Sequence, residues 1–142
     1  MRDHWRGFVM ALVVVAVWAV ACGPTVEPIA TPTQTEGVLR GLAPVDAIDV
    51  LILESFPVQV HVRVTGNLPD GCTTLGEITQ ERQGTAFSVE VGTMRPAGAM
   101  CTEALVPFQT TVALDVLGLK AGTYTVTVNG VSGTFALSID NQ

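Results

Sequence analysis

The chain has 142 residues, a net charge of −6 at pH 7, and only 14% charged residues. This acidic balance argues against binding to nucleic acid, and against electrostatic adhesion to anionic lipid, because both need clustered cations. The high hydrophobic content, 48%, is explained by an N-terminal apolar segment and by valine-rich strands, so it does not indicate a membrane domain.

The N-terminus has the pattern of a secretory signal peptide. A short charged start precedes an apolar run, residues 8–22, which is shorter than the roughly 20 residues that span a bilayer. Cys22 follows the small residues Ala19 and Ala21, the arrangement of a bacterial lipoprotein signal. We therefore predict a signal peptide at residues 1–21 and a lipidated Cys22. The protein would be exported and anchored to the outer face of the cell membrane, or in the periplasm. An ordinary cleaved signal and an uncleaved anchor are the alternatives.

After cleavage the chain divides into a tether and one domain. Loss of Arg2, Arg6 and Asp3 leaves a net charge of −7, which favours solubility. Residues 22–44 are rich in Pro and Thr without an apolar period, which indicates a flexible spacer. Residues 45–142 are enough for one hydrophobic core.

The domain shows strand signals at short spacing and no convincing helical period. The clearest strand, residues 56–65, places Phe56 and four valines on one face and polar residues on the other, so one face is buried and one is wet. The pattern predicts an all-β fold, a seven-stranded immunoglobulin-like or fibronectin III-like Greek-key β-sandwich. The expected strands are residues 46–53, 56–65, 74–82, 86–93, 108–117, 123–128 and 131–139.

The last two strands form a hairpin. Asn129-Gly130 supplies the positive φ angles of a type I′ turn, and the resulting register places Gly133 where a bulky neighbour from the facing sheet has room. The expected pairs are Val128 with Val131, Val126 with Gly133, and Tyr124 with Phe135. Residues 119–124 also resemble a tyrosine corner, in which a Tyr hydroxyl bonds to upstream backbone.

Two cysteines remain once Cys22 is assigned to lipid. Cys72 and Cys101 fall in loops that lie at the same end of an immunoglobulin-like sandwich, and an exported protein meets an oxidising environment. We predict a Cys72–Cys101 disulfide that would stabilise the fold by roughly 3–4 kcal/mol. Two free thiols are the less favoured alternative.

The sequence offers no recognisable catalytic or cofactor site. The only histidine after the signal peptide, His61, lies on the wet face of a strand. Metal-ligand spacings, phosphate-binding glycine loops and nucleophile motifs are absent from the sequence. Acidic pairs such as Asp46 with Asp49 are typical of solvated strand faces. We predict that the protein is not an enzyme and uses no cofactor or metal.

Loops on a rigid sandwich are the usual place for recognition. The loops expected at the disulfide end carry the candidate recognition residues Asn67, Asp70, Arg95 and Asn129. A disulfide between two of these loops would lower the cost of ordering them on binding. The alternative, which the residues favour somewhat, is that the disulfide only staples a small domain.

Three segments carry a family resemblance: residues 68–72 (LPDGC), 101–108 (CTEALVPF) and 118–130 (GLKAGTYTVTVNG). They resemble small bacterial secreted lipoproteins of unknown function, a likeness that implies no activity. Inhibitors of the chagasin kind share an immunoglobulin-like fold, but their Asn-Pro-Thr-Thr-Gly-Tyr loop is absent. Our hypothesis is a lipid-anchored module with a binding or structural role in the cell envelope; the alternative is a peptidase inhibitor acting through the disulfide-linked loops. The expected partners are the membrane, through the lipid, and an envelope protein, with no nucleic acid.

Overall fold

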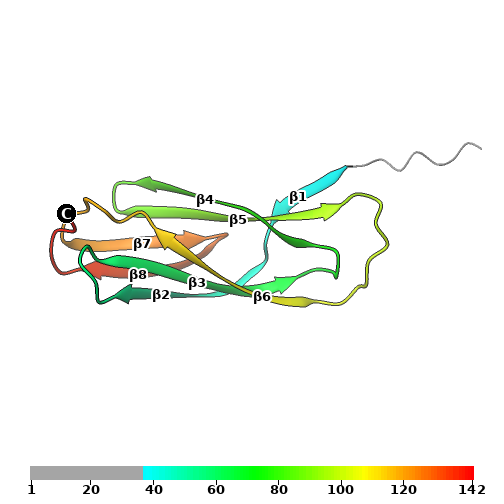
Figure 1. The fold of residues 1–142 in the computed structure, drawn as a ribbon, viewed down its shortest axis with the longest axis horizontal. Coiled ribbons are helices and arrows are strands. Elements are labelled where there is room, and N and C mark those ends of the chain that lie inside the picture. The colour runs from blue at the N-terminus through cyan, green and yellow to red at the C-terminus, as the bar shows by residue number, and fades with distance from the viewer. Residues whose placement is uncertain (1–36) are drawn as a thin grey trace, which may run out of the picture. The chain divides into compact units, whose positions relative to one another are not determined.

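The computed structural model describes residues 37–142, so the predicted signal peptide, Cys22 and most of the predicted tether lie outside the described residues. No helix in residues 37–142 is long and apolar enough to cross a membrane. The described chain forms eight strands (Figure 1), which are β1 (Val38–Leu42), β2 (Val45–Leu53), β3 (Gln59–Leu68), β4 (Thr74–Gln83), β5 (Ala86–Pro96), β6 (Val106–Leu114), β7 (Gly122–Val128) and β8 (Val131–Leu137).

The strands form two facing sheets, which confirms the predicted all-β sandwich. The three-stranded sheet has the order β2-β3-β6, and the five-stranded sheet contains β1, β4, β5, β7 and β8. The prediction of seven strands is wrong by one. The seven predicted strands correspond to β2 through β8, and β1 is additional.

Strand β1 lies inside the segment that the sequence assigned to the tether, so the spacer ends earlier than predicted. It pairs antiparallel with the far half of β5, from Gly92 to Pro96, whereas β7 pairs with the near half, from Ala86 to Val89. All five residues of β1 are exposed. The strand therefore carries no alternating burial pattern, and its conformation is set by the edge of β5.

The strand order of the larger sheet differs from that of an immunoglobulin domain. There the third and sixth strands of seven are neighbours, whereas here β5 lies between β4 and β7 and pairs with β7 in parallel. The chain is therefore a β-sandwich with its own arrangement in this sheet.

The core lies between the sheets and is built from the inward faces that the alternation predicts. Val60, Val62 and Val64 of β3 are fully buried. They face an aromatic cluster in which the ring centroids of Tyr124 and Phe135 lie 5.3 Å apart. The prediction that Phe56 lies on the buried face is wrong. Its side chain is 74% exposed, because β3 begins three residues later, at Gln59.

The predicted hairpin is confirmed in every pair of its register. Asn129 and Gly130 have φ angles of 45° and 95°, as a type I′ turn requires. A Cβ atom at Gly133 would meet Val50 and Ile48 of the facing sheet within 3.3 Å, so the glycine makes room for β2. The tyrosine corner is also present, since the Tyr124 hydroxyl donates to the Lys120 carbonyl at 2.8 Å.

One edge of the sandwich is closed by a side chain. Gln80 of β4 donates from Nε2 to the Ala113 carbonyl and accepts from the Asp115 amide, both at 3.2 Å. The amide of Gln80 thus joins the edge strands β4 and β6 of the two sheets.

Candidate functional site

The two loops that carry the cysteines meet at one end of the sandwich (Figure 1), and we call residues 69–73 and 97–105 the disulfide-linked end. Cys72 and Cys101, the pair that the sequence predicts, are joined there in a disulfide with a Cα–Cα distance of 5.5 Å. The loops lie together because β3 and β5 both end here, and β4 and β6 both begin here.

Asp70 organises the first of these loops. Its Oδ1 accepts hydrogen bonds from the amides of Cys72 and Thr73 at 2.9 and 2.8 Å, and from the Thr73 hydroxyl at 2.9 Å. Its Oδ2 accepts from Nε of Arg95 at 2.9 Å. One carboxylate thus closes the turn and binds the end of β5.

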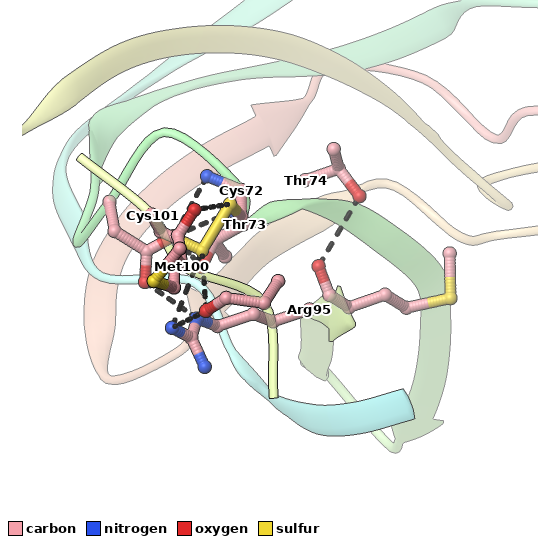
Figure 2. A network of polar contacts seen from close by, with 9 residues as sticks. Cys72, Thr73, Thr74, Arg95, Met100 and Cys101 are labelled. Carbon is pink, nitrogen blue, oxygen red and sulfur yellow. Dashed lines mark hydrogen bonds and ion pairs between the residues drawn. A yellow bond between two sulfur atoms is a disulfide. The ribbon is translucent and has the colours of Figure 1, made fainter. Parts of the chain in front are cut away.

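Arg95 extends the network to the second loop. Its Nη2 donates to the Ala99 carbonyl at 3.4 Å and lies 3.4 Å from Sγ of Cys101, as Figure 2 shows beside the disulfide. The Gly71 amide also donates to the Thr102 carbonyl at 3.1 Å. The loops are therefore held together by a covalent bond, an ion pair and a backbone hydrogen bond.

Apolar side chains project from this braced structure. Met100 is fully exposed, and Leu105 is 70% exposed. The described chain begins beside the start of this loop, since the Gly37 carbonyl accepts from the Ala97 amide at 2.7 Å. Sequence reasoning missed Met100 and Leu105 because loop residues have no periodicity from which exposure follows.

Two of the four predicted recognition residues, Asp70 and Arg95, contact each other at this end, and the other two do not join them. Asn67 lies near the end of β3, but its side chain donates to the Asp46 carboxylate at 2.7 Å. Asn129 lies part-way along the larger sheet, where its side chain accepts from the Val91 amide at 3.0 Å and donates to the carbonyls of Val91 and Ala43. The Asn129 side chain thus bonds the turn between β7 and β8 to β5 and to Ala43, the residue that follows β1. This role is structural.

One group of potential metal ligands occurs among residues 37–142. The ligand atoms of Asp70, Cys72 and Cys101 lie within 4.8 Å of one another. Both sulfur atoms are joined in the disulfide, and the carboxylate already accepts four hydrogen bonds. The residues therefore do not fit a metal site in this oxidised form.

A shallow surface pocket of about 220 Å³ lies between the start of β3 and the end of β6. His61 and Asp115 are the ionisable residues among those that line it. The remaining lining residues are mostly apolar, and none of them is a serine, threonine, cysteine or lysine.

A family model for the ORF11 β-sandwich domain matches residues 62–137, just over half of the chain. The chain belongs to this family. Three curated relatives from Herpetosiphon aurantiacus are similar to it. The "Uncharacterized 10.2 kDa protein in HgiCIIM 5'region" is 38% identical over 93 residues, which cover 66% of this chain and 98% of that protein. The corresponding proteins in the HgiBIM and HgiEIM 5' regions are 43% identical over 83 residues, covering 58% of this chain and 100% of each. No solved structure matches the chain.

The ORF11 β-sandwich match contains both cysteines, Asp70 and Arg95, so the whole disulfide-linked end lies inside it. Strands β1 and β2 precede it. The relatives carry no assigned activity, which agrees with the expectation of a family of unknown function.

Electrostatics favour the ionised form of Asp70 in this ORF11 domain. Partial burial by itself raises the pKa of the Asp70 carboxyl, but the hydrogen bonds from Cys72 and Thr73 and the charge of Arg95 outweigh it. The pKa therefore lies below its usual value. At the opposite end of the domain, the Lys120 ammonium similarly lowers the pKa of Asp140 through a hydrogen bond of 2.8 Å.

We expect the lowered pKa of Asp70 to make the domain sensitive to acid. Its contribution to stability is complete above the unfolded-state pKa, about 4, and is lost as the pH falls through the lower folded-state pKa. The measurement is the free energy of unfolding between about pH 2 and pH 6 for the wild type and Asp70→Asn. The difference between them should shrink in acid, and Thr73→Val, which removes one donor, should move this change to higher pH. Parallel pH profiles for the wild type and Asp70→Asn would contradict the prediction.

Proposed function

We propose that the protein is a lipid-anchored, extracytoplasmic β-sandwich module of a bacterial cell envelope that acts by binding at its disulfide-linked end. The observation that carries this proposal is the braced pair of loops, from which Met100 and Leu105 project into solvent.

The location is supported by the sequence and by the disulfide. The apolar segment that ends at Cys22 has the layout of a lipoprotein signal. Disulfides persist in oxidising compartments and are rare in the cytosol. A Cys72–Cys101 bond is therefore consistent with an exported domain.

Binding is favoured over catalysis because the central polar groups of this end are already paired. Asp70 accepts four hydrogen bonds, Arg95 is in the ion pair, and both cysteines are oxidised. None of these groups is free to act as a nucleophile or a general base.

The brace also suits a binding surface energetically. Ordering a mobile loop on association costs free energy, whereas residues 97–105 are held at Ala99, Cys101 and Thr102 before any partner arrives. The apolar groups of Met100 and Leu105 are then available for contact at a small ordering cost.

The anchoring step is tested in a bacterial host that expresses the full chain. The wild type is expected to incorporate an alkyne-labelled fatty acid and to stay in the membrane fraction after a carbonate wash. Cys22→Ser should lose both properties while the domain remains folded. Equal labelling of the two proteins would contradict the lipid anchor.

The binding surface is tested by placing a photo-cross-linking amino acid at Met100 in the exported full chain. The matched control carries it at Thr134, an exposed residue on the outer face of β8. Adducts formed from position 100 and not from position 134 support the proposal. Equal adduct patterns from both positions would remove the disulfide-linked end as the binding surface.

A second candidate function, inhibition of a peptidase, is favoured by one observation. Met100 projects directly beside the half-cystine Cys101, so a peptidase cleft would meet a substrate-like segment that is already fixed. The mature chain is assayed against serine and cysteine peptidases, with Met100→Asp as the control. Absence of inhibition across the panel removes this candidate.

A further inference from the structure

We propose that the disulfide-linked end docks on the lipid surface in which Cys22 is anchored. This inference rests on the proposed function and names lipid as the partner of the same end. The bound module would then stand on the membrane with the connection between β2 and β3 facing away.

The first argument is the apolar character of this end. Besides Met100 and Leu105, Val38 and Leu39 of β1 are 57% and 55% exposed. Val38 pairs with Pro96, directly before the loop that carries Met100, and Figure 1 shows β1 starting at the end of the sandwich where this loop lies. Exposed aliphatic groups of this kind are suited to the boundary between headgroups and acyl chains.

The opposite end of the sandwich also exposes apolar side chains, since Phe56, Leu117 and Ile139 are 74%, 64% and 52% exposed there. Apolar character therefore permits lipid contact at either end, and the position of the anchor selects the disulfide-linked end.

The second argument is where the chain arrives. Cys22 precedes Gly37 by 15 residues, which reach at most about 50 Å when fully extended. Gly37 is bonded to Ala97 of the disulfide-linked end. The opposite end of the sandwich lies farther from the anchor by the length of a strand such as β5, about 35 Å. The anchor therefore holds the disulfide-linked end at a high effective concentration beside the lipid, so a weak contact suffices.

The third argument is charge. Residues 37–142 contain ten carboxylate and five cationic side chains. Three of these fifteen belong to the disulfide-linked end: Asp70 and Glu103 in its loops, and Arg95, which pairs with Asp70. This end therefore carries a net charge of −1 and the rest of the domain a net charge of −4. An anionic membrane surface repels the rest of the domain more strongly, which favours the same orientation.

The fourth argument is that the polar groups behind the tip are already paired. The Asp70 carboxylate and the Arg95 guanidinium bond to each other and to backbone. Approach to lipid therefore costs little desolvation free energy at Asp70 and Arg95. The exposed Glu103 carboxylate of the same loop has to stay in the hydrated headgroup region.

The experiment uses the mature chain, residues 22–142, coupled through the Cys22 thiol to maleimide lipid in phosphatidylglycerol–phosphatidylethanolamine vesicles. Cys72 and Cys101 are protected in their disulfide, so Cys22 is the free thiol. Both tryptophans of the chain precede Cys22, and the mature protein contains none. Met100→Trp therefore introduces a single fluorescent reporter at the tip, and Thr134→Trp provides a matched reporter with the same tether.

We expect the emission of Met100→Trp to shift to shorter wavelength on coupling. Lipids brominated near the headgroup should quench it at least about threefold more than Thr134→Trp, because interfacial side chains lie about 5–10 Å into this boundary. Leu105→Ser in the Met100→Trp background should weaken the quenching, because it removes a second exposed apolar side chain from the same loop. Leu105→Trp is a second reporter should Met100→Trp fold poorly by circular dichroism.

Equal quenching of the Met100→Trp and Thr134→Trp proteins, both folded, would overturn the lipid contact. Chemical coupling makes this result independent of lipidation in cells, so a failed anchor and a failed docking surface are distinguished. Absence of quenching at position 100, together with a protein adduct from the cross-linker at the same position, would assign the end to a protein partner instead. That combination would leave the proposed function intact and refute this inference.

Discussion

Replacing Asn141 with alanine is expected to lower the free energy of unfolding by about 3 kcal/mol, although Asn141 is the penultimate residue. Its side chain is fully buried. Its Oδ1 accepts from the Val58 amide at 2.7 Å, and its Nδ2 donates to the carbonyls of Val58 and Val116 at 2.8 and 3.0 Å. Alanine would leave these three backbone groups without their partner, and each unpaired buried group costs about 1–3 kcal/mol.

The effect is large because Asn141 joins segments that are distant in sequence. Its backbone amide also donates to the Leu119 carbonyl, so the C-terminus is bonded to the start of β3 and to the connection between β6 and β7. The hydrogen bonds of the Asn141 side chain thus join the backbone at Val58 to the backbone at Val116. Chain termini fray unless such contacts hold them.

The measurement is denaturant unfolding at neutral pH, with two variants for comparison. Deletion of Gln142, the exposed last residue, should change stability by less than about 0.5 kcal/mol. Asn141→Asp keeps the acceptor for Val58 but places a carboxylate against two carbonyl oxygens, so it should be at least as destabilising as alanine. A loss below about 1 kcal/mol for Asn141→Ala would show that water replaces the amide.

Asn141 illustrates what the sequence could predict and what it could not. The β7–β8 hairpin was predicted pair by pair because its turn, Asn129-Gly130, and its register are set by neighbouring residues. Tyr124 was recognised for the same reason, since its hydroxyl bonds only four residues upstream. The partner of Asn141, by contrast, lies 83 residues away. No local pattern distinguishes this residue from an ordinary polar terminus.

The same difference between local and long-range signals explains which residues of the candidate site were predicted correctly. Asp70 and Arg95 were placed together because the alternation of strand direction puts their loops at one end, and the disulfide requires it. Asn129 was placed with them on the assumption that all strands of a sheet reach its end. The parallel pairing of β5 with β7 stops at Val89, and β5 then continues to Pro96 against β1. The turn therefore lies part-way along the sheet, where Asn129 bonds to backbone instead of facing solvent.

Strand β1 was missed because its signal is tertiary. The residues from Val38 to Leu42 are all exposed, so no face is selected for apolar side chains. Its conformation depends on the unpaired half of β5 beyond the hairpin. The nearby sequence is rich in Pro and Thr, which reads as a spacer.

The second large effect is expected from removing the disulfide. The double variant Cys72→Ala/Cys101→Ala should lose about 3 kcal/mol of stability, because the bond closes a loop with a sequence separation of 29 and so restricts the unfolded chain. Denaturant unfolding without reductant measures the loss. Cys22→Ser is the control, since it removes a cysteine and leaves the disulfide intact.

The same variant separates stapling of the fold from bracing of the loops. If the disulfide only staples the domain, amide hydrogen exchange should rise throughout the core by the factor that the lost stability dictates. If it also braces the disulfide-linked end, residues 97–105 should exchange faster than this global change explains. The loop is then held only by noncovalent contacts, which are those of Arg95 with Asp70 and Ala99 and the backbone hydrogen bond between Gly71 and Thr102. We expect this additional increase, and we expect Arg95→Gln in the double variant to enlarge it further. Unchanged exchange of the loop relative to the core would mean that the ion pair and the hydrogen bonds suffice to brace the loop, and that the disulfide only staples the fold.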